Sequence, residues 1–136
     1  SLQDLEGKGA NWKTLIIIDD DTALNNAIKA YLTKSIPELT VFQSFDGFDA
    51  GAQLAEKKPG FVILDLALPG MNGQELCKRI KTDPTFGKPY VIVITALEEA
   101  GLEEELSRMG ADNFFRKPLE MRDILGTITT AIENNL

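Results

Sequence analysis

Short apolar runs alternate with helical patterns along the chain, and several of these runs end abruptly in a polar residue. The runs expected to form strands are residues 15–19, 40–44, 61–65, 90–95 and 113–116. The segments expected to form helices are residues 22–35, 48–57, 74–81, 98–109 and 119–132. Strands that alternate with helices predict a parallel sheet with helices on both faces, and continuous apolar strands agree because such strands are buried on both sides. We therefore expect an α/β fold, a doubly wound (βα)5 domain with a five-stranded parallel sheet.

Chain length and composition exclude several classes of site. The 136 residues fit one domain, and the single cysteine, Cys77, allows no intrachain disulfide. The sequence contains no histidine, so histidine-based catalysis and histidine metal ligation by this chain are excluded. A formal charge of −7 is poorly suited to direct nucleic-acid binding, but it suits a cation or a basic partner surface.

The first residues and the overall hydropathy set the expected domain boundary and location. Residues 1–12 show no clear periodicity, and we expect them to form an N-terminal linker or expression remnant, with the domain spanning residues 13–136. No apolar run approaches the roughly 20 residues of a membrane span, and no signal-peptide pattern opens the chain. These features predict a cytoplasmic protein without membrane contact.

Polar side chains stand where the expected strands end. Asp19 and Asp20 end the first strand, Asp65 ends the third, Thr95 ends the fourth, and Lys117 follows the fifth. Ligands of doubly wound folds bind outside the carboxyl ends of the strands, so these groups are expected to converge. Two carboxylates about 4 Å apart repel by about 4 kcal/mol at an effective dielectric of 20, and one lysine cannot offset three of them. A Mg²⁺ ion can offset the charge of the three carboxylates, and it suits a site beside a phosphoryl group. A carboxylate in such a site can itself be the phosphoryl acceptor.

Four sequence motifs resemble the receiver domain of two-component response regulators. They are "IIIDDD", "VILDLALPGMNG", "VIVITA" and "FFRKPL", in this order along the chain. The intervals from Asp65 to Thr95 and to Lys117 also match the family, and the similarity covers about residues 13–136. The resemblance implies a flavodoxin-like receiver topology with strand order 2-1-3-4-5.

The resemblance also implies how the acidic residues divide the chemistry. Asp65 would be the phosphoacceptor, taking a phosphoryl group from a phosphohistidine of a histidine kinase or a histidine phosphotransfer protein. Asp20 would ligate Mg²⁺ directly, with Mn²⁺ as an alternative ion. Asp19 would assist directly or through water, and the backbone carbonyl of Ala67 would supply a further ligand. The chain would catalyse only its own phosphorylation and dephosphorylation, and would not be an enzyme acting on other substrates.

Further roles implied by the resemblance concern the phosphoryl group and its readout. Lys117 would pair with the phosphoryl group, Thr95 would turn its hydroxyl toward it, and Ala96 would be the small residue beside it. Pro118 follows Lys117 at the family's cis peptide position. Phe114 occupies the position of the family's aromatic switch residue. Phosphorylation would thus alter a surface formed by the fourth helix, fifth strand and fifth helix, through which a homodimer could form.

Asp21 stands one position past the family's acidic pair. An aspartate at the start of a helix accepts hydrogen bonds from free backbone N–H groups, so we expect Asp21 to cap the helix of residues 22–35, with Thr22 as the competing cap.

This chain has apolar residues at two positions where, in the family, the side chains border the phosphoryl group and influence its hydrolysis. Ala67 lies two residues after Asp65, and Leu97 lies two residues after Thr95. Neither side chain can hydrogen-bond an attacking water, so slow autodephosphorylation is expected.

Two other functions compete with the phosphoacceptor interpretation. One is a degenerate receiver that acts as a phosphorylation-independent interaction module, which the complete set of site residues argues against. The other is a Mg²⁺-dependent phosphohydrolase, which usually needs a second acid or base near the nucleophile, where this chain has Ala67.

Overall fold

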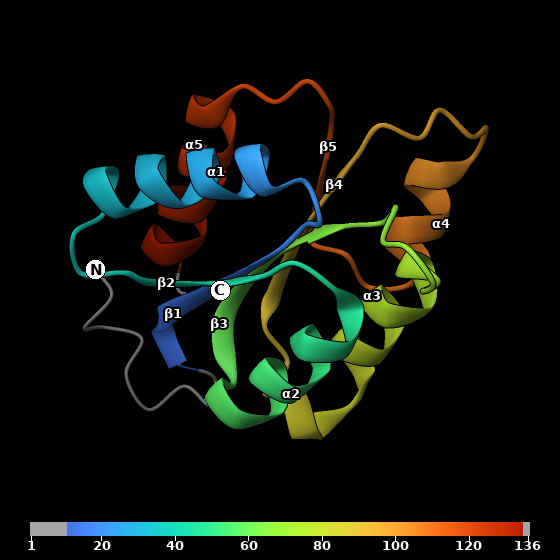
Figure 1. Cartoon of the computed structure of the whole chain (residues 1–136), viewed down its shortest axis with the longest axis horizontal. Helices are drawn as coiled ribbons and strands as arrows, with labels where there is room; N and C mark the ends of the chain where they lie inside the picture. Colours follow the sequence, from blue (N-terminus) through green and yellow to red (C-terminus); the bar gives the residue numbers. More distant parts are fainter. Residues whose placement is uncertain (1–10, 135–136) are drawn as a thin grey trace.

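The strands form one parallel sheet in the order β2-β1-β3-β4-β5. The computed structural model describes residues 11–134 (Figure 1). The strands are β1 (Asn11–Ile18), β2 (Thr40–Ser44), β3 (Pro59–Asp65), β4 (Tyr90–Thr95) and β5 (Asn113–Arg116). The helices are α1 (Thr22–Ser35), α2 (Gly47–Lys57), α3 (Gly73–Thr82), α4 (Leu102–Arg108) and α5 (Met121–Glu133), with a 3₁₀ turn, η2 (Pro84–Phe86). The predicted doubly wound fold and strand order are confirmed.

Apolar side chains on both faces of the sheet hold the helices in place. Alternate residues of β1 point to opposite faces, so Leu15 and Ile17 pack toward α1 and α5, while Ile16 and Ile18 pack toward α2, α3 and α4. All four are fully buried, and each such side chain contributes roughly 1.5–3 kcal/mol on burial. Figure 1 shows α1 and α5 on one side of the sheet and α2 and α3 on the other. The sheet is therefore buried on both faces, as its apolar strands predicted.

Polar caps begin the helices that follow the first three strands. Asp21 accepts a hydrogen bond from the Leu24 N–H at 3.1 Å, which confirms its predicted capping role at α1. Asp46 and Asn72 cap α2 and α3 in the same way. Each cap fixes where its helix begins after the preceding strand, at the edge of the sheet where Asp19 and Asp65 lie.

The first strand begins earlier than the sequence indicated. β1 starts at Asn11 rather than at residue 15, so Asn11 and Trp12 belong to the strand and not to the expected linker of residues 1–12. The rest of that linker, residues 1–10, lies outside the described residues. Trp12 packs edge-on against Phe61, with ring centroids 5.3 Å apart. This aromatic contact extends β1 across a polar segment that lacked a strand pattern.

The fourth helix is shorter than expected. Its predicted start was residue 98, but α4 begins at Leu102. Gly101 precedes it with a φ of +76°, a left-handed conformation that interrupts a right-handed helix. The carboxylates of Glu103, Glu104 and Glu105 then fall in the first turn, where the helix dipole favours negative charge. Residues 98–101 are therefore part of the β4–α4 loop.

Among residues 11–134, no helix combines the length and apolar character needed to cross a membrane.

Candidate functional site

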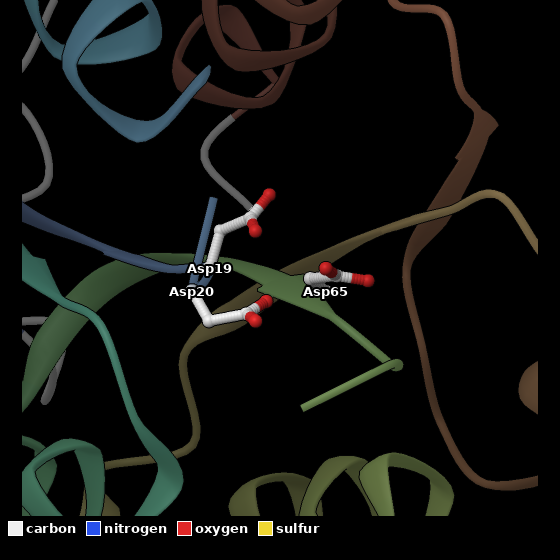
Figure 2. A group of neighbouring side chains, drawn as sticks. All are labelled: Asp19, Asp20 and Asp65. Atoms are coloured by element: carbon white, nitrogen blue, oxygen red, sulfur yellow. The ribbon is translucent and has the colours of Figure 1, made fainter. Parts of the chain in front are cut away.

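Three carboxylates meet at the carboxyl ends of β1 and β3. Asp19 and Asp20 follow the last residue of β1, and Asp65 is the last residue of β3 (Figure 2). One oxygen from each lies within 4.8 Å of the others. Asp19 and Asp65 are buried, whereas Asp20 is exposed. The sequence therefore identified a group of residues that the fold brings together.

Lys117 bridges the two buried carboxylates. Its ammonium lies 3.1 Å from Asp19 Oδ2 and 3.1 Å from Asp65 Oδ2. The other oxygen of each carboxylate accepts a backbone N–H two residues later, from Asp21 at 2.9 Å and from Ala67 at 3.0 Å. Both carboxylates thus have one oxygen fixed by their own loop and one facing Lys117. The peptide bond between Lys117 and Pro118 is cis.

A buried asparagine that the sequence analysis missed fixes the β1–α1 loop. The Asn25 side-chain amide donates to the backbone carbonyls of Asp19 at 3.0 Å and Ser44 at 3.1 Å, and Gln43 donates to its oxygen. These bonds tie the end of β1 to the end of β2. An asparagine at an apolar position of the α1 face was the available signal, because a buried amide requires partners.

Burial and neighbouring charge act in opposite directions on the ionisable groups of this site. Burial raises the pKa of Asp19 from 3.8 to about 6, although hydrogen bonds from the Asp21 N–H and from Lys117 partly offset it. Burial also lowers the pKa of Lys117, but hydrogen bonds to Asp19 and Asp65 outweigh this effect, so its pKa is raised overall. Lys117 therefore stays charged at neutral pH, whereas the Asp19 charge is held at an energetic cost.

This cost predicts a specific pH dependence of stability. Because the pKa of Asp19 in the folded state lies above its unfolded value, folding favours the protonated carboxyl, and stability rises as the pH falls through about 6. For Asp19 alone, the metal-free protein should gain about 1 kcal/mol in free energy of unfolding between about pH 7 and about pH 5. Denaturant unfolding in EDTA at both pH values, with Asp19→Asn as the reference, measures this contribution of Asp19 to the free energy of unfolding. A difference between the two proteins that is independent of pH would contradict it.

Thr95 and the strand β5 form a second set of contacts beside the carboxylates. Thr95 is fully buried, and its hydroxyl oxygen accepts the Leu97 N–H at 3.0 Å. The Arg116 guanidinium donates to the Leu97 carbonyl and lies 5.5 Å from the centre of the Phe114 ring. Leu97 is thus held through its N–H by β4 and through its carbonyl by β5. The sequence analysis did not single out Arg116, because an arginine before Lys117 carries no distinguishing pattern.

The remaining candidate residues lie in the loops after β3 and β4 and on β5. Ala67 and Ala96 are exposed in the loops after β3 and β4, two residues after Asp65 and one residue after Thr95. Phe114 is half-buried and packs with the apolar side chains on the α3 and α4 face of the sheet. It also lines a cavity of about 190 Å³ between α4 and β5, together with Glu103 and Leu106.

The chemistry of the carboxylate group is that of a cation site. Its ligand atoms are all carboxylate oxygens, which hard divalent cations prefer, and Lys117 neutralises only one of the three charges. Exposed Asp20 leaves the group open to solvent, so an ion could enter without the fold opening. The residues present therefore fit a bound cation.

Comparisons with known proteins agree on one family. Residues 15–129 match the response regulator receiver domain, within the expected domain of residues 13–136. The response regulator PleD of Caulobacter vibrioides is 33% identical over 106 residues, which cover 78% of this chain and 23% of that protein. The transcriptional regulatory protein CrdR of Helicobacter pylori is 32% identical over 112 residues, which cover 82% of this chain and 51% of that protein. The chain therefore spans about a quarter of the length of PleD and about half of the length of CrdR.

Solved structures show the same fold. The signal receiver domain of a DNA-binding response regulator from Colwellia psychrerythraea superimposes with a TM-score of 0.83 and 31% identity, covering 88% of this chain and 98% of that one. The receiver domain of a LuxO repressor protein from Vibrio parahaemolyticus gives a TM-score of 0.80 and 27% identity, covering 90% and 91%. These structural likenesses agree with the match to the response regulator receiver domain over residues 15–129. The protein belongs to the receiver domains of two-component response regulators.

Proposed function

We propose that this chain is a phosphoacceptor that receives a phosphoryl group on Asp65. The observation that carries the proposal is the convergence of Asp19, Asp20 and Lys117 around Asp65 at the carboxyl end of β3. The Asp65 side chain is nearly buried, and its Oδ2 faces Lys117. A carboxylate placed between a cation site and an ammonium is suited to nucleophilic attack on a phosphoryl group, because both positive charges offset the charge of the incoming phosphate.

The proposed donor is a phosphohistidine on a histidine kinase or on a histidine phosphotransfer protein. An Asp65 oxygen forms the new bond to phosphorus while the bond from phosphorus to the imidazole nitrogen breaks. The electron pair of that bond stays with the imidazole, and the product on this chain is an acyl phosphate. Lys117 can then bind a phosphoryl oxygen from its place beside Asp65. Apart from this transfer and the loss of its phosphoryl group, the chain is proposed to catalyse no reaction.

Mg²⁺ is the proposed cofactor. Asp20 and Asp65 would hold it directly, Asp19 would hold it directly or through water, and the Ala67 backbone carbonyl would complete the protein ligands. When bound, Mg²⁺ supplies positive charge for the phosphoryl oxygens and an electrostatic partner for the crowded carboxylates. The all-oxygen donor set and the open side at Asp20 support this assignment.

The proposed output is a change at the surface formed by α4, β5 and α5. Turning the Thr95 hydroxyl toward a phosphoryl group would break the hydrogen bond that its oxygen accepts from the Leu97 N–H. Leu97 is also bound by Arg116, which lies against Phe114, so the two strands would respond together. The half-buried Phe114 ring is the proposed switch residue on β5, and homodimerisation through this surface is a proposed consequence.

The lifetime of the phosphoryl group is predicted to be long. Ala67 and Leu97 offer no side-chain hydrogen bond to an attacking water, so the phosphorylated wild type should persist for minutes or longer. Introducing an amide by Ala67→Asn should shorten this lifetime, because the amide can orient water beside Asp65. A time course of intact mass in Mg²⁺ after removal of the phosphodonor measures both rates. Loss of the wild-type adduct within seconds would contradict the prediction.

The two alternative functions are separated by one experiment. The protein is incubated with acetyl phosphate and Mg²⁺, and its intact mass is measured beside that of Asp65→Asn. A degenerate receiver would show no phosphoryl adduct on the wild type. A phosphohydrolase would instead turn over p-nitrophenyl phosphate continuously, whereas an acceptor stops at one phosphoryl group per chain.

The acidic surface supports protein partners over nucleic acid for this domain. Its formal charge of −7 opposes binding to a phosphate backbone. The relatives include a transcriptional regulatory protein, of which this chain matches about half. Direct contact with nucleic acid is therefore not proposed for the domain itself.

A further inference from the structure

The strongly exposed large apolar side chains in the described part of the chain gather at one place. Phe48 is 91% exposed, Phe45 is 40% exposed and Met71 is 38% exposed. Phe45 and Phe48 flank Gly47, the first residue of α2, and Met71 packs on Gly47 so closely that a Cβ there would overlap its sulfur. Phe45, Phe48 and Met71 are named here the Phe48 patch. A contiguous exposed apolar patch marks an interaction site, whereas a single exposed apolar residue does not.

The Phe48 patch adjoins the proposed phosphoacceptor. Phe45 directly follows Ser44, whose carbonyl accepts the Asp19 N–H at 3.1 Å. Met71 lies on the loop that leads from Asp65 to α3. The strand order places β2 and β5 at opposite edges of the sheet, and Figure 1 shows α2 and α4 well apart. The patch is therefore next to the acceptor but separate from the surface of α4, β5 and α5.

Exposed acidic side chains lie on the segments that carry the Phe48 patch and on the adjoining β1–α1 loop. Asp20 and Asp21 are exposed in the β1–α1 loop, and Asp46 and Asp49 are exposed at the start of α2. The segments that form this region contain no lysine or arginine; they are residues 19–28, 44–56 and 65–75. A matching surface would have an apolar pocket bordered by lysine or arginine side chains.

We propose that the Phe48 patch docks the protein that donates the phosphoryl group, with Phe48 entering an apolar pocket bordered by basic residues near the donor's phosphohistidine. This inference rests on the proposed function, since it concerns how a donor reaches Asp65. A second copy of this chain is a poor occupant, because face-to-face pairing would bring the four aspartates of each copy together. A donor fits better, because its histidine must reach Asp65 and an ordinary interface covers about 800 Å² on each partner. Such a footprint around Asp65 extends over the neighbouring loops that carry the patch.

Aromatic and charged residues have different expected effects on docking. A large aromatic side chain that becomes fully buried at an interface commonly dominates affinity, so the loss of Phe48 should act through KM. The exposed aspartates near the patch steer a basic surface during encounter, so their effect should weaken as salt is added.

The test compares phosphorylation by proteins with phosphorylation by a small molecule. The histidine kinases and histidine phosphotransfer proteins of the source organism are purified, loaded from ATP, and screened for transfer to the wild type. The fastest donor is then used with Phe48→Ser and the conservative Phe48→Leu. Asp49→Lys is compared with Glu56→Lys, which makes the same charge change on the same helix, seven residues away and 77% exposed. Acetyl phosphate is the small donor for every variant.

Phe48→Ser should raise KM for the protein donor about tenfold or more, and Phe48→Leu should restore most of the loss. Asp49→Lys should slow transfer at low salt while Glu56→Lys does not, and acetyl phosphate should phosphorylate all variants alike. Equal transfer to wild type and Phe48→Ser would overturn the docking proposal. The proposal would also be overturned if acetyl phosphate phosphorylates the wild type but none of the screened proteins does. Failure of acetyl phosphate to label the wild type would instead overturn the proposed function.

Discussion

Asp20→Ala is expected to abolish Mg²⁺-dependent phosphorylation while leaving the fold intact. Asp20 is the exposed member of the carboxylate group, so its removal leaves no buried polar atom without a partner. A metal ion contributes several kcal/mol of charge stabilisation to a phosphoryl transfer, so the rate should fall by about 100-fold or more. Intact mass after timed incubation with acetyl phosphate and Mg²⁺ measures the rate, and circular dichroism checks the fold.

Asp21→Ala is the matched control, one residue along the same loop. It removes the side chain that caps α1 through the Leu24 N–H, which should cost about 1 kcal/mol of stability. The Asp21 backbone N–H that binds Asp19 remains, so phosphorylation should continue at close to the wild-type rate. Equal loss of phosphorylation in both variants would contradict the division of roles between these neighbouring aspartates.

Lys117→Met is expected to destabilise the metal-free protein and to impair phosphorylation. The ammonium is hydrogen-bonded to Asp19 and Asp65, whose side chains are 0% and 4% exposed. Without it, two buried carboxylates face each other, and breaking a buried ion pair from one side costs about 3–5 kcal/mol. Denaturant unfolding in EDTA should show a loss of about this size near neutral pH.

A double variant separates loss of the charge from loss of packing. Asp19→Asn removes one of the two carboxylates, so Lys117→Met should cost less stability in that background than in the wild type. Adding Mg²⁺ should also recover part of the stability of Lys117→Met, because a cation replaces the missing positive charge. Identical costs in both backgrounds would mean that Lys117 stabilises the fold through its aliphatic stem rather than its charge.

The strands could be predicted well because their signal is local. β2, β4 and β5 have the predicted bounds, since short runs that contain β-branched or aromatic residues and are bounded by turn residues identify strands. The start of α4 could not be found in this way. Its acidic residues continue a helical pattern back to Glu98, but the left-handed conformation of Gly101 decides the boundary. The early start of β1 depends on the contact between Trp12 and Phe61, which are distant in sequence.

The members of the candidate site were predictable, but their contacts were not. Parallel strands end at one edge, so polar residues at the ends of β1 and β3 had to approach each other. Which oxygen faces Lys117 depends on the turns after Asp19 and Asp65, where backbone N–H groups bind the other oxygen. An amide at an apolar position of α1 marks Asn25 as a buried group that needs partners, but neither its partners nor those of Arg116 can be found from a local pattern, because they belong to other elements.

The central claim is tested most directly by the intact mass of the protein after incubation with acetyl phosphate. Four samples are sufficient: wild type with Mg²⁺, wild type with EDTA, Asp65→Asn with Mg²⁺, and Asp20→Ala with Mg²⁺. A phosphoacceptor of the proposed kind gains the mass of one phosphoryl group in the first sample only, and hydroxylamine removes it because the bond is an acyl phosphate. A wild type without an adduct, or an equal adduct on Asp65→Asn, would contradict the account.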